Sequence, residues 1–124
     1  MEGKRMQKRI TILKANNKES KLLLESNEPI NGLVPGEQIL VDSDHYSFIY
    51  LMENQEDYTY VVLPEVFWPS LKAANEQEFP VCLSFEGEQI ELTNFHDELE
   101  YVISNIKGNS NYGNEMVTKV EEIF

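Results

Sequence analysis

Apolar and polar residues alternate along much of the first half of the chain with the two-residue period of β-strands. The β-branched pair Ile10 and Ile12 alternates with Arg9 and Thr11, which predicts a first strand over residues 9–15. The following segments are expected to be a turn at 16–18, a second strand at 21–26, a loop rich in Asn, Gly and Pro at 27–35, and a third strand at 38–42.

The next hairpin gives the strongest local signal. Two apolar segments, 46–53 and 58–63, flank a four-residue polar loop at 54–57. If residue 53 faces residue 58, the register pairs Leu51 with Tyr60 and Ile49 with Val62 on one face, and Tyr50 with Val61 and Phe48 with Leu63 on the other. A hairpin with two apolar faces belongs in the middle of a sheet, covered on both sides or covered on one side and used for binding on the other.

Helical periods appear in the second half. A short helix is expected over 66–75 with Pro69 in its first turn, and a second hairpin over 80–85 and 89–92. Asn94 is expected to cap a helix that ends at Gly108, and Asn114 to cap the last helix. The apolar stripes of these two helices are Phe95, Leu99, Val102, Ile103 and Ile106 in the first, and Met116, Val117, Val120, Ile123 and Phe124 in the second.

Hairpins dominate this order, so the fold class is α+β. We expect a single domain over residues 1–124, with a mostly antiparallel sheet built from hairpins, a short middle helix and two C-terminal helices packed on one face. Residues 1–8 show no periodicity and are expected to be a basic lead-in that can be disordered. A hydrophobic content of 41% is enough for a core and excludes a fully disordered chain.

Charge divides the sequence into two parts. The net charge is −12, but residues 1–21 hold seven bases and two acids, whereas residues 22–124 hold three lysines, no arginine and 20 acids. Proteins that bind nucleic acid neutralise phosphates with Lys and Arg, so the acidic part argues against nucleic acid as a partner. We expect the basic first strand to lie against the acidic part, within one chain or exchanged between two copies, with Ile10, Ile12 and Leu13 buried.

The apolar runs are too short for a signal peptide or a membrane span, which predicts a cytoplasmic protein with no membrane partner. Cys82 is the single cysteine, in agreement with a reducing compartment. Its neighbours Val81 and Leu83 favour a buried thiol that acts as a small hydrophobe over a nucleophile.

Asp42, Asp44 and His45 form the tightest cluster of carboxylates and imidazole in the chain. Two carboxylates at a strand end can hold a divalent cation, and an imidazole favours a transition metal. The favoured interpretation is a turn between strands in which Asp and Ser bond their own backbone.

Two further candidates lie in the C-terminal part. His96 and Glu100 are one helical turn apart and could meet as an acid–base pair, although a solvated first turn of a helix is favoured. The loop 108–113 could present backbone N–H groups to an anion beside the last helix. The candidate binding residues in this loop are Asn109, Asn111 and Tyr112.

Motifs that carry chemistry are absent. The sequence contains no G-x-S-x-G, P-loop, G-x-G-x-x-G or HExxH pattern, and His45 and His96 are its two histidines. The sequence therefore predicts no catalytic residue, no cofactor and no metal ligand set, and it favours a function that is not enzymatic.

Several segments resemble the YjbL-like family of small uncharacterised proteins from Gram-positive Firmicutes. They are Leu40-Val41-Asp42-Ser43-Asp44 with Tyr46 and Phe48, Glu91-Leu92-Thr93 with Phe95-His96, Asn105 to Asn109, Asn111-Tyr112-Gly113, and Val120-Glu121-Glu122. The resemblance covers residues 38–124 and implies a cytosolic bacterial protein with no established activity, cofactor or catalytic residue.

Two hypotheses follow. The first is a non-catalytic, acidic protein-interaction module whose partner is basic and is bound through the acidic surface or the tyrosine-bearing hairpin. The second is a small-molecule or divalent-metal site, with or without enzymatic activity, built from the Asp42 to His45 turn and the Asn109 to Tyr112 loop. The sequence leaves the oligomeric state open, and a homodimer is compatible with it.

Overall fold

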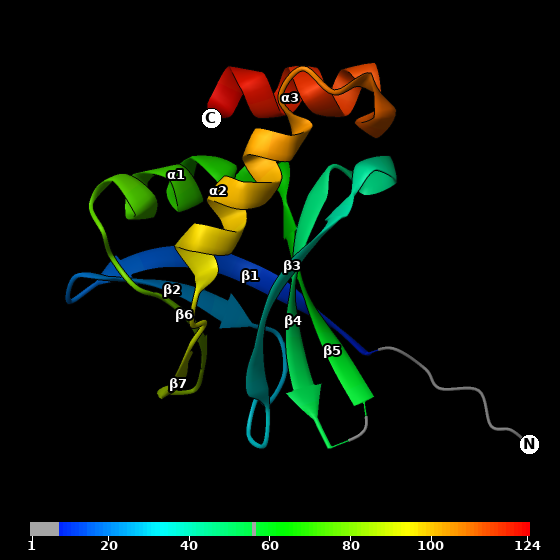
Figure 1. Cartoon of the computed structure of the whole chain (residues 1–124). Helices are drawn as coiled ribbons and strands as arrows, with labels where there is room; N and C mark the ends of the chain where they lie inside the picture. Colours follow the sequence, from blue (N-terminus) through cyan, green and yellow to red (C-terminus); the bar gives the residue numbers. More distant parts are fainter. Residues whose placement is uncertain (1–7, 56) are drawn as a thin grey trace, which may run out of the picture.

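The long central strand β1 (Lys8–Lys18) joins the two halves of a curled sheet. Its first residues pair in parallel with β5 (Asp57–Pro64), and its later residues pair antiparallel with β2 (Lys21–Ser26). The computed structural model describes residues 8–55 and 57–124, and these form seven strands in the order β3-β4-β5-β1-β2-β6-β7 (Figure 1). The other strands are β3 (Val34–Asp42), β4 (Ser47–Asn54), β6 (Val81–Phe85) and β7 (Glu88–Glu91).

Most neighbouring strands run antiparallel, as predicted. The exceptions in the described sheet are β1 with β5 and β2 with β6, which are parallel. The described residues also form three α-helices, α1 (Trp68–Glu76), α2 (Phe95–Ile106) and α3 (Asn114–Ile123). Short 3-10 helices precede β4, α1 and α3: η1 (Ser43–His45), η2 (Glu65–Phe67) and η3 (Ser110–Tyr112).

The three helices lie on one side of the curled sheet, and the main core lies between the two layers (Figure 1). Trp68 is fully buried in this core, where its ring packs 4.8 Å from that of Phe48 and its indole N–H donates to the carbonyl of Leu63. The predicted α+β class, with helices on one face, is therefore confirmed. None of the described helices is long and apolar enough to span a membrane.

The register of the β4–β5 hairpin is the one that the sequence predicts. Glu53 faces Tyr58, and every pair named above is found. Phe48, Tyr50 and Met52 are buried in the main core under the helices. Ile49 and Leu51 alternate with them and therefore point to the opposite side, which we call the outer sheet face.

β1 shows how alternation is interrupted. Ile10 and Ile12 are buried as expected, but Leu13 is 64% exposed, so its predicted burial is wrong. The pairing with β2 shifts between Ile12 and Lys14, and this irregularity adds one residue to β1. Because of the extra residue, Ile12 and then Ala15 face the core side, while Leu13 points to the outer sheet face.

The predicted turn at 16–18 is also wrong. Asn17 pairs with Leu22 and Lys18 with Lys21, so β1 continues until a two-residue turn at Glu19 and Ser20, both of which have positive φ. The pairing with β2 outweighs the turn preference of asparagine here.

β3 begins at Val34, earlier than expected, and contains an irregularity between Pro35 and Ile39. Gly36 lies in this stretch, where a Cβ would come 2.8 Å from the carbonyl oxygen of Leu51. A residue without a side chain is therefore required for β3 to approach β4 at this point.

Two expected helix caps are not formed. Asn94 stands at the start of α2 with φ 62°, a left-handed conformation in which its side chain makes no cap hydrogen bond. Gly113, not Asn114, occupies the cap position of α3, and it has no side chain to cap with. Gly108 does have the positive φ expected of a residue that ends a helix.

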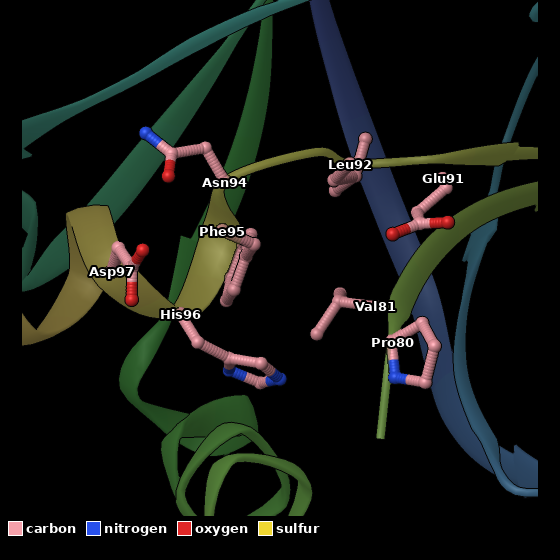
Figure 2. Close-up of a pocket in the computed structure, with 8 residues that line it drawn as sticks. All are labelled: Pro80, Val81, Glu91, Leu92, Asn94, Phe95, His96 and Asp97. Atoms are coloured by element: carbon pink, nitrogen blue, oxygen red, sulfur yellow. The ribbon is translucent and has the colours of Figure 1, made fainter. Parts of the chain in front are cut away.

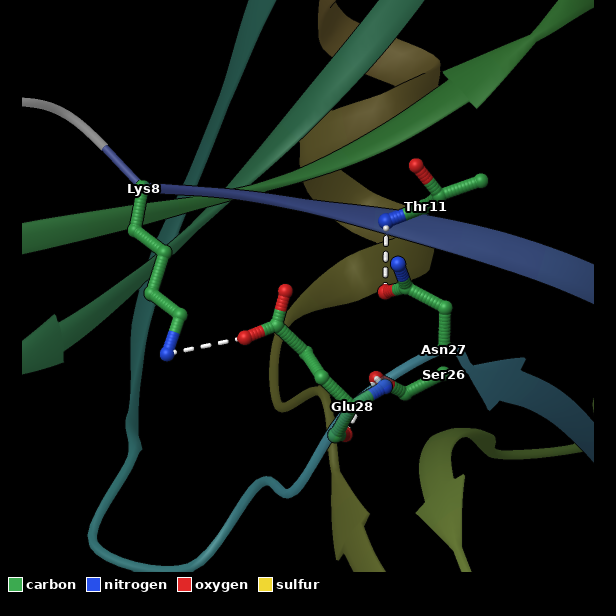
Figure 3. A network of polar contacts seen from close by, with 5 residues as sticks. All are labelled: Lys8, Thr11, Ser26, Asn27 and Glu28. Atoms are coloured by element: carbon green, nitrogen blue, oxygen red, sulfur yellow. Dashed lines mark hydrogen bonds and ion pairs between the residues drawn. The ribbon is translucent and has the colours of Figure 1, made fainter.

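The basic strand is tied to acidic residues of the same chain. Lys8 pairs with Glu28 at 2.8 Å and Lys14 with Glu25 at 3.7 Å. The side chain of Asn27 accepts a hydrogen bond from the backbone of Thr11 (Figure 3). The expected docking of the first strand within one chain is therefore found, with β1 inside the sheet.

Candidate functional site

The corner between β3 and β4 is organised by Asp42. One of its carboxylate oxygens accepts from the backbone N–H of His45 at 3.3 Å, and the other lies 2.9 Å from Nδ1 of the same imidazole. Asp42 thereby caps η1, and both of its oxygens are engaged within the turn. The turn interpretation is confirmed for Asp42 and His45. No group of three or more His, Cys, Asp or Glu in the described ranges is placed to hold a metal ion.

The Asn109 to Tyr112 loop likewise bonds to itself. The side chain of Asn109 accepts from the backbone N–H of Asn111 at 3.1 Å and donates to the carbonyl of Asn105. The backbone N–H of Gly108 donates to the carboxylate of Glu121 in α3. The asparagines therefore shape η3 and the entry into α3.

The two candidate segments do meet, through Asp44 and Tyr112. Both line a hollow of about 350 Å³ beside the start of α3. Asp42, His45, Asn109 and Asn111 are not among the residues that line it. The other lining residues are Ser43, Tyr46, Gly113, Asn114, Glu115 and Met116.

Tyr46 adds a contact that sequence reasoning missed. Its hydroxyl donates to a carboxylate oxygen of Glu115 at 2.7 Å, and the ammonium of Lys119 lies 4.9 Å from the centre of its ring. Lys119 in turn pairs with Glu65 at 3.2 Å. The hydrogen bond to Glu115 is the main cause that raises the pKa of Tyr46, with smaller contributions from desolvation and nearby carboxylates. Tyr46 and Glu115 are 69 positions apart, so no local pattern signals this contact.

His96 does not pair with Glu100, so that expectation is wrong. Its Nε2 lies 2.6 Å from the carbonyl oxygen of Phe79. A carbonyl only accepts, so Nε2 carries the proton and donates. Glu100 instead accepts from the side chain of Asn75 at 2.9 Å. His96 and Glu100 of α2 thus both form hydrogen bonds to the segment from α1 to Phe79, and these bonds hold α2 against that segment.

Nδ1 of His96 is buried and has no hydrogen-bond partner among the described residues. The imidazole extends toward Pro80 and Val81 at the edge of a hollow of about 160 Å³ (Figure 2). Asp97 and Glu91 also line this hollow.

Cys82 is buried, which agrees with its expected role as a small hydrophobe. Burial raises the pKa of its thiol; Lys21 acts in the opposite direction and Glu91 in the same one. The thiol therefore stays protonated at neutral pH, which disfavours a nucleophilic role.

The outer sheet face carries exposed apolar side chains. Val34 and Tyr58 both flank Glu53 at one end of this face and are 58% and 49% exposed. Leu13 lies at the other end. Between them, Ile49 and Leu51 are buried, and Tyr60 and Val62 are partly buried. The guanidinium of Arg9 lies 5.4 Å from the centre of the Tyr60 ring.

Comparison with known proteins identifies the relatives of this chain. Residues 9–124 match the model of a family of unknown function, UPF0738. The UPF0738 protein YjbL of Bacillus subtilis is 45% identical over 123 residues, which cover 96% of this chain and 99% of the relative. A UPF0738 protein of Bacillus pumilus is 46% identical over 121 residues, covering 96% and 99%. One of Geobacillus thermodenitrificans is 36% identical over 122 residues, covering 96% and 98%.

No solved structure is significantly similar to this chain. The expected resemblance to YjbL-like proteins is confirmed, and the match reaches back to residue 9, through the N-terminal strands. The names of these relatives assign no activity. On the extent of these matches, the chain belongs to the UPF0738 family.

Proposed function

We propose that this chain is a cytoplasmic, non-catalytic protein-interaction module that contacts its partner through the outer sheet face. The observation that supports it most is the exposure of Leu13, Val34 and Tyr58 on the side of the sheet opposite the helices. Exposed apolar side chains that gather on one face are typical of interaction sites, and tyrosine is enriched at their centres.

The charge on this face is mixed. Arg9 lies over the ring of Tyr60, Lys14 is paired with Glu25, and Glu53 lies between Val34 and Tyr58, whereas many carboxylates lie on the helices. Net charge alone suggested a basic partner, which the helical layer would attract more strongly than this face. The helical acids are Glu76, Asp97, Glu98, Glu100, Glu115, Glu121 and Glu122.

Site-specific photocrosslinking in a Bacillus host tests the proposal. Tyr58 on the outer sheet face and Tyr101 on α2 are both exposed, so each can be replaced by p-benzoylphenylalanine without disturbing the core. We expect a discrete crosslinked product from position 58 and not from position 101. Tyr58→Ser should then weaken co-purification of that product's partner, and Tyr101→Ser should leave it unchanged. Equal crosslinking from both positions would contradict the proposal.

The hollow beside α3 supports a second candidate function, binding of a small polar ligand. Asp44 and Glu115 both line it, so a ligand with a positive charge is favoured. A thermal-shift screen with divalent cations and small amines tests this candidate, because a ligand of the folded state raises the melting temperature. Asp44→Asn should remove any such shift. A screen without a hit, or a shift that survives Asp44→Asn, argues against this candidate.

A further inference from the structure

A different hollow, of about 280 Å³, lies between α1 and α2. Its apolar side is formed by Leu99 and Ile103 of α2 and by Phe124, which follows α3. Lys72 of α1 and Lys107, directly after α2, line it from the two helices. The size is near the lower end of ligand pockets, which indicates a small molecule.

The two lysines are unusual in their surroundings. Residues 22–124 contain three lysines against 20 acids, so each lysine has many potential ion-pair partners. Lys119 forms such an ion pair, with Glu65. Lys72 and Lys107 have no ion-pair partner within residues 8–55 and 57–124; Lys72 is half-buried and Lys107 is exposed. Two of these three lysines thus line one hollow, which is also lined by Glu76 and Glu100.

The acids that line the same hollow limit the charge of its ligand. Glu100 accepts a hydrogen bond from Asn75, and Glu76 is exposed at the surface. These carboxylates would repel a ligand that carries several negative charges, such as a polyphosphate. A single anionic head placed between the two ammonium groups avoids most of that repulsion.

We propose that the hollow between α1 and α2 binds a small amphipathic monoanion, in which a carboxylate lies between Lys72 and Lys107 and an apolar body packs on Leu99, Ile103 and Phe124. The two lysines select a negatively charged head group, and the apolar side of the hollow selects an apolar body in the ligand. This site is separate from the outer sheet face, so its test does not depend on the proposed interaction function.

Octanoate is a suitable probe because octylammonium has the same tail with the opposite charge. The full chain, labelled with ¹⁵N, is titrated with each compound below its micelle concentration. Octanoate should shift the amide resonances of α1 and α2 around residues 72–76 and 103–107 in a saturable manner. Octylammonium should bind several-fold more weakly, and acetate, which lacks the tail, should not saturate.

Charge-removing variants test the assigned lysines. Lys72→Gln and Lys107→Gln should each weaken octanoate binding about two- to fivefold, as expected for the loss of one partly exposed charge contact. Lys18→Gln, an exposed lysine on β1, is the matched control and should leave the affinity unchanged. The proposal would be overturned if octylammonium bound as tightly as octanoate, or if Lys72→Gln and Lys107→Gln both left the octanoate affinity unchanged. Resonance shifts confined to the sheet would overturn it as well.

Discussion

The hydroxyl of Tyr50, in the middle of β4, donates a 2.6 Å hydrogen bond to the carbonyl oxygen of Thr93, in the link between β7 and α2. Tyr50 is fully buried, and its ring stacks on that of Phe95 at 5.8 Å. One side chain therefore connects one half of the sheet to the helix that follows the other half.

Removal of this hydroxyl should destabilise the fold. Tyr50→Phe keeps the ring packing but leaves the carbonyl of Thr93 without this donor, so we expect a loss of about 1–2 kcal/mol in the free energy of unfolding. Urea denaturation measures the loss. Tyr101→Phe, on the exposed surface of α2, is the control and should change stability by less than about 0.5 kcal/mol. A Tyr50→Phe variant as stable as the parent would show that the bond contributes nothing.

Stability should also fall at alkaline pH because of Tyr50. Burial is the main cause that raises the pKa of this phenol above its ordinary value of 10.0, and the side chain of Thr93 and the backbone of Glu37 partly oppose it. As the pH rises, the phenol of Tyr50 therefore loses its proton in the unfolded chain before it does so in the folded chain. Its contribution to the free energy of unfolding is complete below pH 10 and is lost as the pH rises through the pKa of the folded state. Unfolding free energies at several values between pH 8 and pH 11 measure this loss. The free energy of unfolding should fall less steeply with pH in Tyr50→Phe than in the parent. Identical slopes in the two proteins would assign the loss to other groups.

The irregularity in β1 predicts opposite effects for two apolar residues in the same strand. Ile10→Ala should cost about 2–5 kcal/mol because it opens a cavity in the core. Leu13→Ala should cost less than about 0.5 kcal/mol because Leu13 is exposed on the outer sheet face. Chemical denaturation of the two variants side by side tests the placement of the irregularity. Comparable losses would mean that Leu13 is buried after all.

The two histidines should behave differently. His96→Ala removes the donor to the carbonyl of Phe79 and should cost about 1–2 kcal/mol. His45→Ala, in an exposed turn, should change stability by less than about 0.5 kcal/mol. Imidazole ¹⁵N shifts should report a proton on Nε2 of His96. A neutral Nδ1–H tautomer would exclude the hydrogen bond to Phe79.

Local pattern was enough to predict much of the fold. The β4–β5 register follows from alternation on two faces around a short polar loop, and all its pairs are found. The parallel pairing of β1 with β5 could not be predicted, because the partners of Ile10 lie about fifty positions later and no periodicity encodes that choice. The exposure of Leu13 depends on an irregularity that arises from pairing and not from the residue itself.

The candidate site was predicted only in part, for a related reason. Asp42 and the asparagines of the loop were selected for their chemistry, and they use it to bond their own turns. Asp44 and Tyr112 meet through the packing of α3, and the contact of Tyr46 with Glu115 depends on the same packing. Lys72 and Lys107 were counted in the sequence, but only the packing of α1 against α2 brings them to one hollow.

The position of β1 inside the sheet constrains the order in which this protein can fold. β1 and β2 precede the other described strands in the sequence, yet their outer neighbours, β5 and β6, come from later parts of the chain. The early hairpin therefore has two unpaired edges until those strands emerge from the ribosome, and the long sequence separation makes their pairing slow. Lysines along both edges, such as Lys8 and Lys21, discourage pairing with other chains in the meantime.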